Sequence, residues 1–192
     1  MKQKFYTNIL IVTMVVILGC NTKKDATDVT KTSNNTCDTI KIETRYSARL
    51  TEDVPTYVTD SFINKAVEAF TIDTLQKNLS EILPLKKEPF RNIHDTVRID
   101  TIFHFSGARD TIKFYKSREK NFMIYLYLTS PEMALDSCVH PGMSKASFQS
   151  IFGINRPVGN TIQIANSDGT LRFIFYFRDD VLKRIESDFY FG

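Results

Sequence analysis

The residue with the most specific chemistry in this sequence is Cys20, whose thiol stands at the end of a short apolar stretch. Two lysines lie near the start of the chain, residues 9–18 are almost entirely apolar, and the small residue Gly19 precedes the cysteine. This order is typical of a secretory signal. With a cysteine at the cleavage point, it predicts removal of residues 1–19 as a signal peptide and lipidation of Cys20. The alternatives are an ordinary cleaved signal and a short buried helix.

The apolar stretch is too short to cross a bilayer, because a spanning helix needs about 20 apolar residues. Two or three acyl chains on Cys20 would anchor the protein stably, at ~0.8 kcal/mol per buried methylene. We therefore expect the membrane to be contacted through this lipid. Asn21 follows the cysteine, whereas Asp is the usual inner-membrane retention signal in the lipoproteins that this signal resembles. The expected location is the outer membrane, with the folded domain in the periplasm or at the cell surface.

The chain after the lipidation site divides into a polar segment and a longer apolar-patterned region. Residues 20–38 are rich in Thr, Asn, Lys, Ser and Asp, a composition that predicts a disordered tether. Residues 39–192 are long enough for one globular domain. They are also long enough for two small modules, at 39–130 and 131–192, that share a core.

Once Cys20 is acylated, Cys37 and Cys138 remain as an even pair in an exported protein. Such proteins use paired cysteines as disulfides. A bridge closing a loop of about 100 residues would contribute up to roughly 4–5 kcal/mol in the chain-entropy description. The alternative is two unpaired thiols, one on the tether and one buried in the domain.

The remaining reactive residue types do not form a recognisable catalytic or metal-binding pattern. His94 and His104 are ten residues apart on one predicted strand, and His140 near Cys138 lacks a third or fourth ligand nearby in sequence. The chain has no Gly-x-Ser-x-Gly elbow and no phosphate-binding glycine loop. The sequence therefore predicts no catalytic residue, no metal site, no cofactor and no enzymatic activity.

The charge balance gives no indication of a nucleic-acid partner. The formal net charge is +3, and it falls to about +1 when the two lysines of the signal are removed. A nucleic-acid-binding domain would carry a clustered basic face. The basic runs here are interrupted by acids or by Asn, which indicates solvated loops.

Hydrophobic periodicity predicts an α+β fold in which helices cover an antiparallel sheet. Helical spacing is found at 62–70, at 75–83 and after Ser144, and strand patterns at 39–50, 97–105, 112–114, 122–128, 161–165, 171–178 and 181–189. In the strand at 97–105, Val97, Ile99, Phe103 and Phe105 share one face. The order of helix and then three strands occurs twice, which predicts two modules in tandem.

Two tyrosines are the candidate partner-binding residues. Tyr125 and Tyr127 lie on the face of the predicted central strand opposite Ile124, Leu126 and Leu128. Tyrosine is enriched at protein interfaces, so an open sheet face would present these rings to a partner. The alternative is that the second module covers this face.

The C-terminal third resembles a known family of envelope proteins. Residues 141–144 (Pro-Gly-Met-Ser), then Phe148, Phe152-Gly153 and Pro157, resemble the helix motif of the BamE-like (SmpA/OmlA) lipoproteins, and residues 177–185 resemble their last hairpin. The same module in tandem resembles the beta-lactamase-inhibitor-protein fold. Both families bind other proteins rather than catalyse reactions, so the resemblance implies protein binding, and we expect Met143, Phe148 and Phe152 to be core residues.

These patterns together predict a lipid-anchored bacterial envelope protein that binds another envelope protein without catalysis, as a scaffold or accessory of a complex. Two alternatives stay open from the sequence. One is an inhibitor or immunity-type module against an envelope enzyme. The other is a lipoprotein that binds a small ligand.

Overall fold

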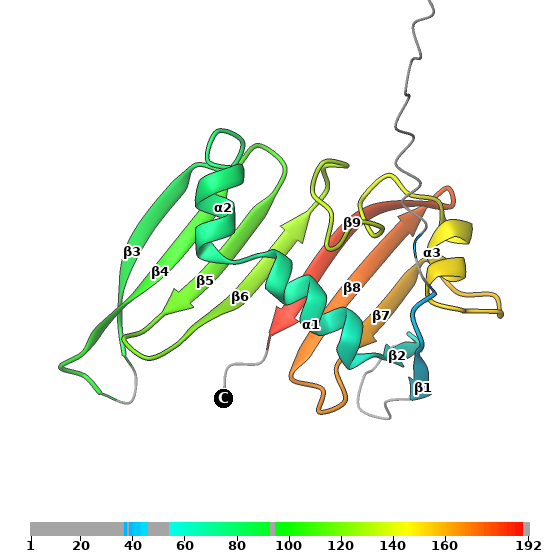
Figure 1. The fold of residues 1–192 in the computed structure, drawn as a ribbon, viewed down its shortest axis with the longest axis horizontal. Helices are drawn as coiled ribbons and strands as arrows, with labels where there is room; N and C mark the ends of the chain where they lie inside the picture. Colours follow the sequence, from blue (N-terminus) through cyan, green and yellow to red (C-terminus); the bar gives the residue numbers. More distant parts are fainter. Residues whose placement is uncertain (1–36, 38, 46–53, 93–94, 190–192) are drawn as a thin grey trace, which may run out of the picture. The chain divides into compact units, whose positions relative to one another are not determined.

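A nine-stranded mixed β-sheet is the framework of the computed structural model, which describes residues 37, 39–45, 54–92 and 95–189 (Figure 1). The strand order is β1-β2-β7-β8-β9-β6-β5-β4-β3. The strands are β1 Glu43–Arg45, β2 Thr56–Val58, β3 Leu85–Arg91, β4 Ile99–Ser106, β5 Thr111–Lys116, β6 Asn121–Leu128, β7 Thr161–Ala165, β8 Leu171–Arg178 and β9 Val181–Phe189.

Two antiparallel meanders build most of this sheet. The first runs β3-β4-β5-β6 and the second β7-β8-β9, and each strand pairs with its neighbour in sequence. The meanders are joined by β6 and β9, which pair antiparallel from Tyr125↔Asp188 to Leu128↔Ile185. On the other side, β2 pairs with β7 in parallel, which makes the sheet mixed.

The described residues form three short helices, and each begins at a hydroxyl side chain that accepts a backbone N–H. These caps are Thr59 for α1 (Asp60–Ala69), Thr71 for α2 (Ile72–Asn78) and Ser144 for α3 (Lys145–Ile151). Capping satisfies one of the backbone donors that the first helical turn leaves open. The helices bury Phe62 and Ile63, Ile72 and Leu75, and Phe148 and Ile151, respectively, in one hydrophobic core with the sheet.

The core contains a cluster of phenylalanines between the helices and the second meander. Phe148 of α3 has its ring centroid 4.6 Å from that of Phe152, 4.8 Å from that of Phe175 and 5.3 Å from that of Phe177. Met143, Phe148 and Phe152 are all buried, so the prediction that they are core residues is confirmed. Aromatic pairs at these distances stabilise a core beyond the area they bury.

The prediction of an antiparallel sheet built from two helix-plus-three-strand modules in tandem is wrong. The sheet is mixed, because β2 pairs with β7 in parallel. The structure has one continuous sheet, because β6 of the first meander and β9 of the second pair directly with each other. Two separate sheets would each expose an edge with unpaired N–H and C=O groups, and the β6–β9 pairing satisfies both edges at once. The first meander also has four strands rather than three, because Leu85–Arg91 forms β3.

Strand β3 escaped prediction because it lies at the edge of the sheet, where nearly all its side chains are exposed and no apolar alternation is required. Pro89 fits there because an edge strand has N–H positions without a partner. At the opposite edge, the strand predicted at 39–50 is present only as β1, and residues 46–50 lie outside the described part of the chain.

Candidate partner-binding face of the sheet

The sheet has an inner face, which packs against the helices, and an opposite face that we call the outer face. Successive strand residues point to opposite sides, so the cross-strand register assigns each side chain to a face. The outer face carries mainly aromatic and polar side chains of β4, β5, β6, β8 and β9: His104, Lys113, Tyr115, Tyr125, Tyr127, Tyr176, Arg184 and Glu186, together with the aliphatic Ile102. All three described helices contribute their buried residues to the core on the inner side (Figure 1).

The two tyrosines singled out from the sequence lie side by side on this outer face but differ in exposure. Tyr125 is 37% exposed, whereas Tyr127 is half-buried. Their strand contains a bulge opposite Lys113 and Phe114. Because of this extra residue, Met123 rather than Ile124 packs in the core with Leu126, which corrects the predicted face of this part of the strand.

Tyr127 belongs to a cluster centred on Arg184 of β9. The guanidinium carbon lies 3.8 Å from the ring centroid of Tyr176 and 6.0 Å from that of Tyr127, and its Nε lies 3.1 Å from a carboxylate oxygen of Glu186. Burial opposes the charge of Arg184, but the Glu186 carboxylate and Tyr176 raise its pKa overall. Burial, followed by Glu186, raises the pKa of Tyr176. The cluster is therefore a fixed cation between two rings.

Tyr125 lies beside a second cation on the neighbouring strand. The ammonium group of Lys113 is 5.4 Å from the ring centroid of Tyr125. Burial, and then the Glu186 carboxylate, raise the pKa of Tyr125, which keeps the hydroxyl protonated at neutral pH. A neutral phenol next to a cation and a carboxylate offers both apolar area and hydrogen bonding to a partner.

His104 on β4 lies on the outer face next to Glu88. Its Nε2 lies 3.3 Å from a carboxylate oxygen of Glu88 on β3, a pairing that favours the protonated ring. Burial and the nearby Lys113 nevertheless hold the pKa of His104 below its ordinary value. At neutral pH the ring is therefore uncharged, and its Nε2–H can donate to Glu88.

Toward the β3–β4 hairpin, the outer face is held together by a polar network under aromatic rings. The buried Asp100 carboxylate accepts hydrogen bonds from the Tyr115 hydroxyl and from Asn92, and it forms an ion pair with Arg98 at 3.3 Å. The Tyr115 hydrogen bond is the main cause that lowers the pKa of Asp100. The Tyr115 ring also contacts the ring of Phe122, with the centroids 5.1 Å apart.

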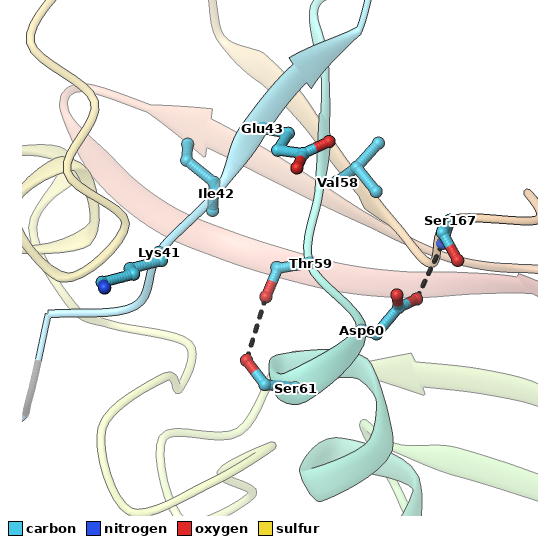
Figure 2. Close-up of a pocket in the computed structure, with 8 residues that line it drawn as sticks. All are labelled: Lys41, Ile42, Glu43, Val58, Thr59, Asp60, Ser61 and Ser167. Atoms are coloured by element: carbon cyan, nitrogen blue, oxygen red, sulfur yellow. Dashed lines mark hydrogen bonds between the residues drawn. The ribbon is translucent and has the colours of Figure 1, made fainter.

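One open hollow of about 360 Å³ lies on the outer face, lined by Tyr127, Thr129, Tyr176, Phe177, Arg178, Lys183 and Arg184. A second hollow, of about 470 Å³, lies beside the start of α1 (Figure 2). Its polar groups serve the local structure: Asp60 accepts the backbone N–H of Ser167, and the Thr59 and Ser61 hydroxyls share a hydrogen bond. We therefore assign no chemistry to the second hollow.

The cysteine pair joins the N-terminal part of the described chain to the segment between β6 and α3. Cys37 and Cys138 are joined in a disulfide, with their Cα atoms 5.9 Å apart. This bridge attaches residue 37 to the loop before α3. The predicted lipidation site Cys20, the signal 1–19 and the tether 20–38 lie outside the described residues, apart from Cys37 itself.

The described residues give no geometry for metal binding. In this part of the chain, His, Cys, Asp and Glu side chains do not gather in groups of three that would suit a metal ion. His140 contacts the carbonyl oxygen of Pro141 through Nδ1 at 2.8 Å. Among the described helices, none has the length and apolar character needed to cross a membrane.

Sequence reasoning identified Tyr125 and Tyr127 but missed the residues that surround them. Tyr176, Arg184 and Glu186 lie on strands whose inner residues were recognised, and the alternation along β8 already separated Tyr176 from the phenylalanines. The missing information was the pairing of β9 with β6, which places Glu186 opposite Tyr127.

Comparison with models of known protein families finds no match, and neither does comparison with curated proteins or with solved structures. The likeness to the BamE-like lipoproteins therefore remains a prediction from the quoted residues, and the outer face has to be interpreted from its own chemistry.

Proposed function

We propose that this chain is a lipid-anchored protein of the bacterial envelope that binds another protein through the outer face of its sheet, without catalysing a reaction. The observation that supports the binding role is the exposed aromatic surface of β6 beside fixed charges. Anchoring rests on the sequence pattern that ends at Cys20.

The outer face has the composition of an interface core. Tyr125 is 37% exposed and Phe122 is 38% exposed, so together they offer two large rings to a partner. Aromatic residues and arginine are enriched at interfaces, and they account for a large share of binding hot spots. The charges of Lys113, Arg184 and Glu186 lie near Tyr125 and would orient a partner.

The polar groups of this face are paired within the sheet rather than aimed together at one point. Arg184 stacks on Tyr176 and pairs with Glu186, and His104 pairs with Glu88. A catalytic site would require an acid, base or nucleophile positioned around a common reacting atom. Paired charges on a broad, open face instead favour recognition of a surface.

The proposal is tested by photo-crosslinking in cells from a benzophenone amino acid at position 125 of the full chain. The matched control carries the same amino acid at Lys65, an exposed position on α1. We expect one dominant protein adduct from position 125 and none from position 65. Equal adducts from both positions, or none from position 125, would contradict binding at the outer face.

A second test measures capture of the crosslinked protein by Tyr125→Ala and Tyr125→Phe. The alanine variant should weaken capture roughly tenfold, at about 1.4 kcal/mol for a truncated interface aromatic, while the phenylalanine variant retains most of it. The melting temperature should change little, because Tyr125 is exposed. Tyr127 is unsuited to this test, since its ring contacts Arg184 in the folded protein.

A further inference from the structure

The apolar stripe of the inner face continues beyond the helices at the hairpin end of β3 and β4. Phe105 and Phe103 of β4 are buried, but Ile99 on the same side of the strand is 70% exposed, and Val97 before it is 92% exposed. The sequence predicts one shared apolar face for these four residues. In Figure 1, α2 lies toward the other end of these strands, so the last part of the stripe has no helix over it.

Cations surround this uncovered part of the stripe. A groove of about 510 Å³ is lined by Ile99 and Phe103 together with the cations Lys87, Arg98, Lys116 and Arg118. Asp100 is the one carboxylate that lines it, and this group is occupied by Arg98, Asn92 and Tyr115. The lining therefore carries a net charge of +3, from four cations and one carboxylate.

Two of the four cations, Lys87 and Lys116, lie over the apolar surface, whereas Arg98 is paired with Asp100. The ammonium groups of Lys87 and Lys116 lie 5.1 and 5.7 Å from the ring centroid of Phe103. Two acids lie near this end of the sheet. The Asp95 carboxylate accepts the backbone N–H of Val97 at 3.2 Å, and the carboxylate of Glu119, whose side chain is 72% exposed, lies 3.7 Å from Arg98. Such a weak, exposed pair leaves most of the positive potential available.

We propose that this end of the sheet, formed by Val97, Ile99, Lys87, Arg98, Lys116 and Arg118, binds the surface of an anionic phospholipid membrane. An anionic bilayer presents phosphate groups above a hydrocarbon layer, and peripheral proteins match it with basic side chains around apolar residues that enter the headgroup boundary. The described residues at this end of the sheet have this arrangement, since Ile99 lines the groove with the four cations and the exposed Val97 lies two residues before it in the chain. An acidic protein would match the charges but would leave Val97 and Ile99 without an apolar partner.

This contact is independent of the partner-binding face, so the two proposals fail separately. The test uses the mature full-length chain with Cys20→Ser, which removes the predicted acyl anchor. The probes are vesicles of phosphatidylcholine alone and of phosphatidylcholine with phosphatidylglycerol, compared by flotation. We expect binding to the anionic vesicles only, with loss of binding at high salt.

Charge variants test whether this groove is responsible. Lys116→Gln with Arg118→Gln should weaken binding about 30-fold, at about fivefold for each basic residue near the surface. Glu119→Gln should strengthen it. The matched control pair, Lys65→Gln with Lys77→Gln, removes two exposed cations on α1 and α2 and should leave binding unchanged. An equal loss from the control pair would overturn the assignment to this groove.

The insertion of the β3–β4 turn can be observed directly, because the chain contains no tryptophan. Val97→Trp places a single reporter at the tip, and Lys65→Trp places one on α1 as the control. Anionic vesicles should shift the emission of the first to shorter wavelength and leave the second unchanged. No shift at position 97, or binding to a polyglutamate peptide in preference to the vesicles, would overturn the proposal.

Discussion

The disulfide between Cys37 and Cys138 is expected to supply a large share of the stability of the domain. We consider the double substitution Cys37→Ser with Cys138→Ser, made together with Cys20→Ser so that no thiol remains. The bridge joins residues separated by 101 positions. For a loop of about 100 residues, the chain-entropy description gives about 4.7 kcal/mol of stabilisation, which acts by restricting the unfolded chain.

The native contacts of the bridged segment should persist without the disulfide. The N–H of Ile40 donates to the carbonyl of Ile151 at 2.6 Å, and Ile40 and Ile42 pack against the core. The folded state therefore changes little. The free energy of unfolding falls mainly because the unfolded chain gains conformational entropy without the crosslink. We expect the free energy of unfolding to fall by about 3–5 kcal/mol and the melting temperature by about 10 °C.

The measurement is guanidinium unfolding of the Cys20→Ser protein and of the triple variant, each with and without reductant. Reductant should lower the free energy of unfolding of the Cys20→Ser protein to that of the triple variant. It should leave the triple variant unchanged. The denaturant slope should also rise, because the unfolded chain exposes more surface without the crosslink. The reasoning is refuted by a difference below about 1 kcal/mol, or by two reactive thiols in protein purified without reductant.

Three further predictions concern titration, close packing and the aromatic core. Folding lowers the pKa of His104, so its contribution to the free energy of unfolding should be fully present above the unfolded pKa of about 6.5 and should be lost as the pH falls from 7 to 5. Denaturant unfolding of His104→Gln at several pH values should show a weaker pH dependence than the parent protein, and an unchanged dependence would refute this. Gly107→Ala should lower the free energy of unfolding by about 1–3 kcal/mol, because the added Cβ would lie 2.6 Å from the carbonyl oxygen of Ile82. The control Gly159→Ala should be tolerated, because its Cβ would meet no atom within 4 Å. Equal melting temperatures of the two variants would contradict this. Phe148→Ala should lower the free energy of unfolding by about 3–5 kcal/mol, because the ring is fully buried among three other phenylalanines. A much smaller loss in thermal unfolding would mean that neighbouring side chains fill the cavity.

Local signals in the sequence were sufficient for the elements of the C-terminal third. The strands expected at 161–165, 171–178 and 181–189 match β7, β8 and β9, and the helix expected after Ser144 is α3, with Ser144 as its N-cap. The tight turn between β8 and β9 lies at Asp179 and Asp180, which both adopt positive φ. Side-chain alternation and capping act within a few residues, which is why they can be recognised without the fold.

The candidate site could be predicted only in part. Tyr125 and Tyr127 were recognised because they alternate with apolar residues along one strand, but the identity of their neighbours depended on which strand pairs with β6. That partner is β9, which follows more than fifty residues later and brings Arg184 and Glu186 beside Tyr127. Pairing between distant strands leaves no periodic pattern in either strand, so it could not be deduced from them.

The apolar side of most elements, the places of most helices and strands, and the position of an expected export and lipidation signal can be recognised in the amino-acid sequence. The union of the two meanders in one sheet, the parallel addition of β2, and the exposure of Val97 and Ile99 become visible in the folded chain alone. This difference arises because hydrophobic periodicity specifies a face to be covered but not what covers it. That choice depends on how all strand edges and apolar faces of the chain are satisfied together.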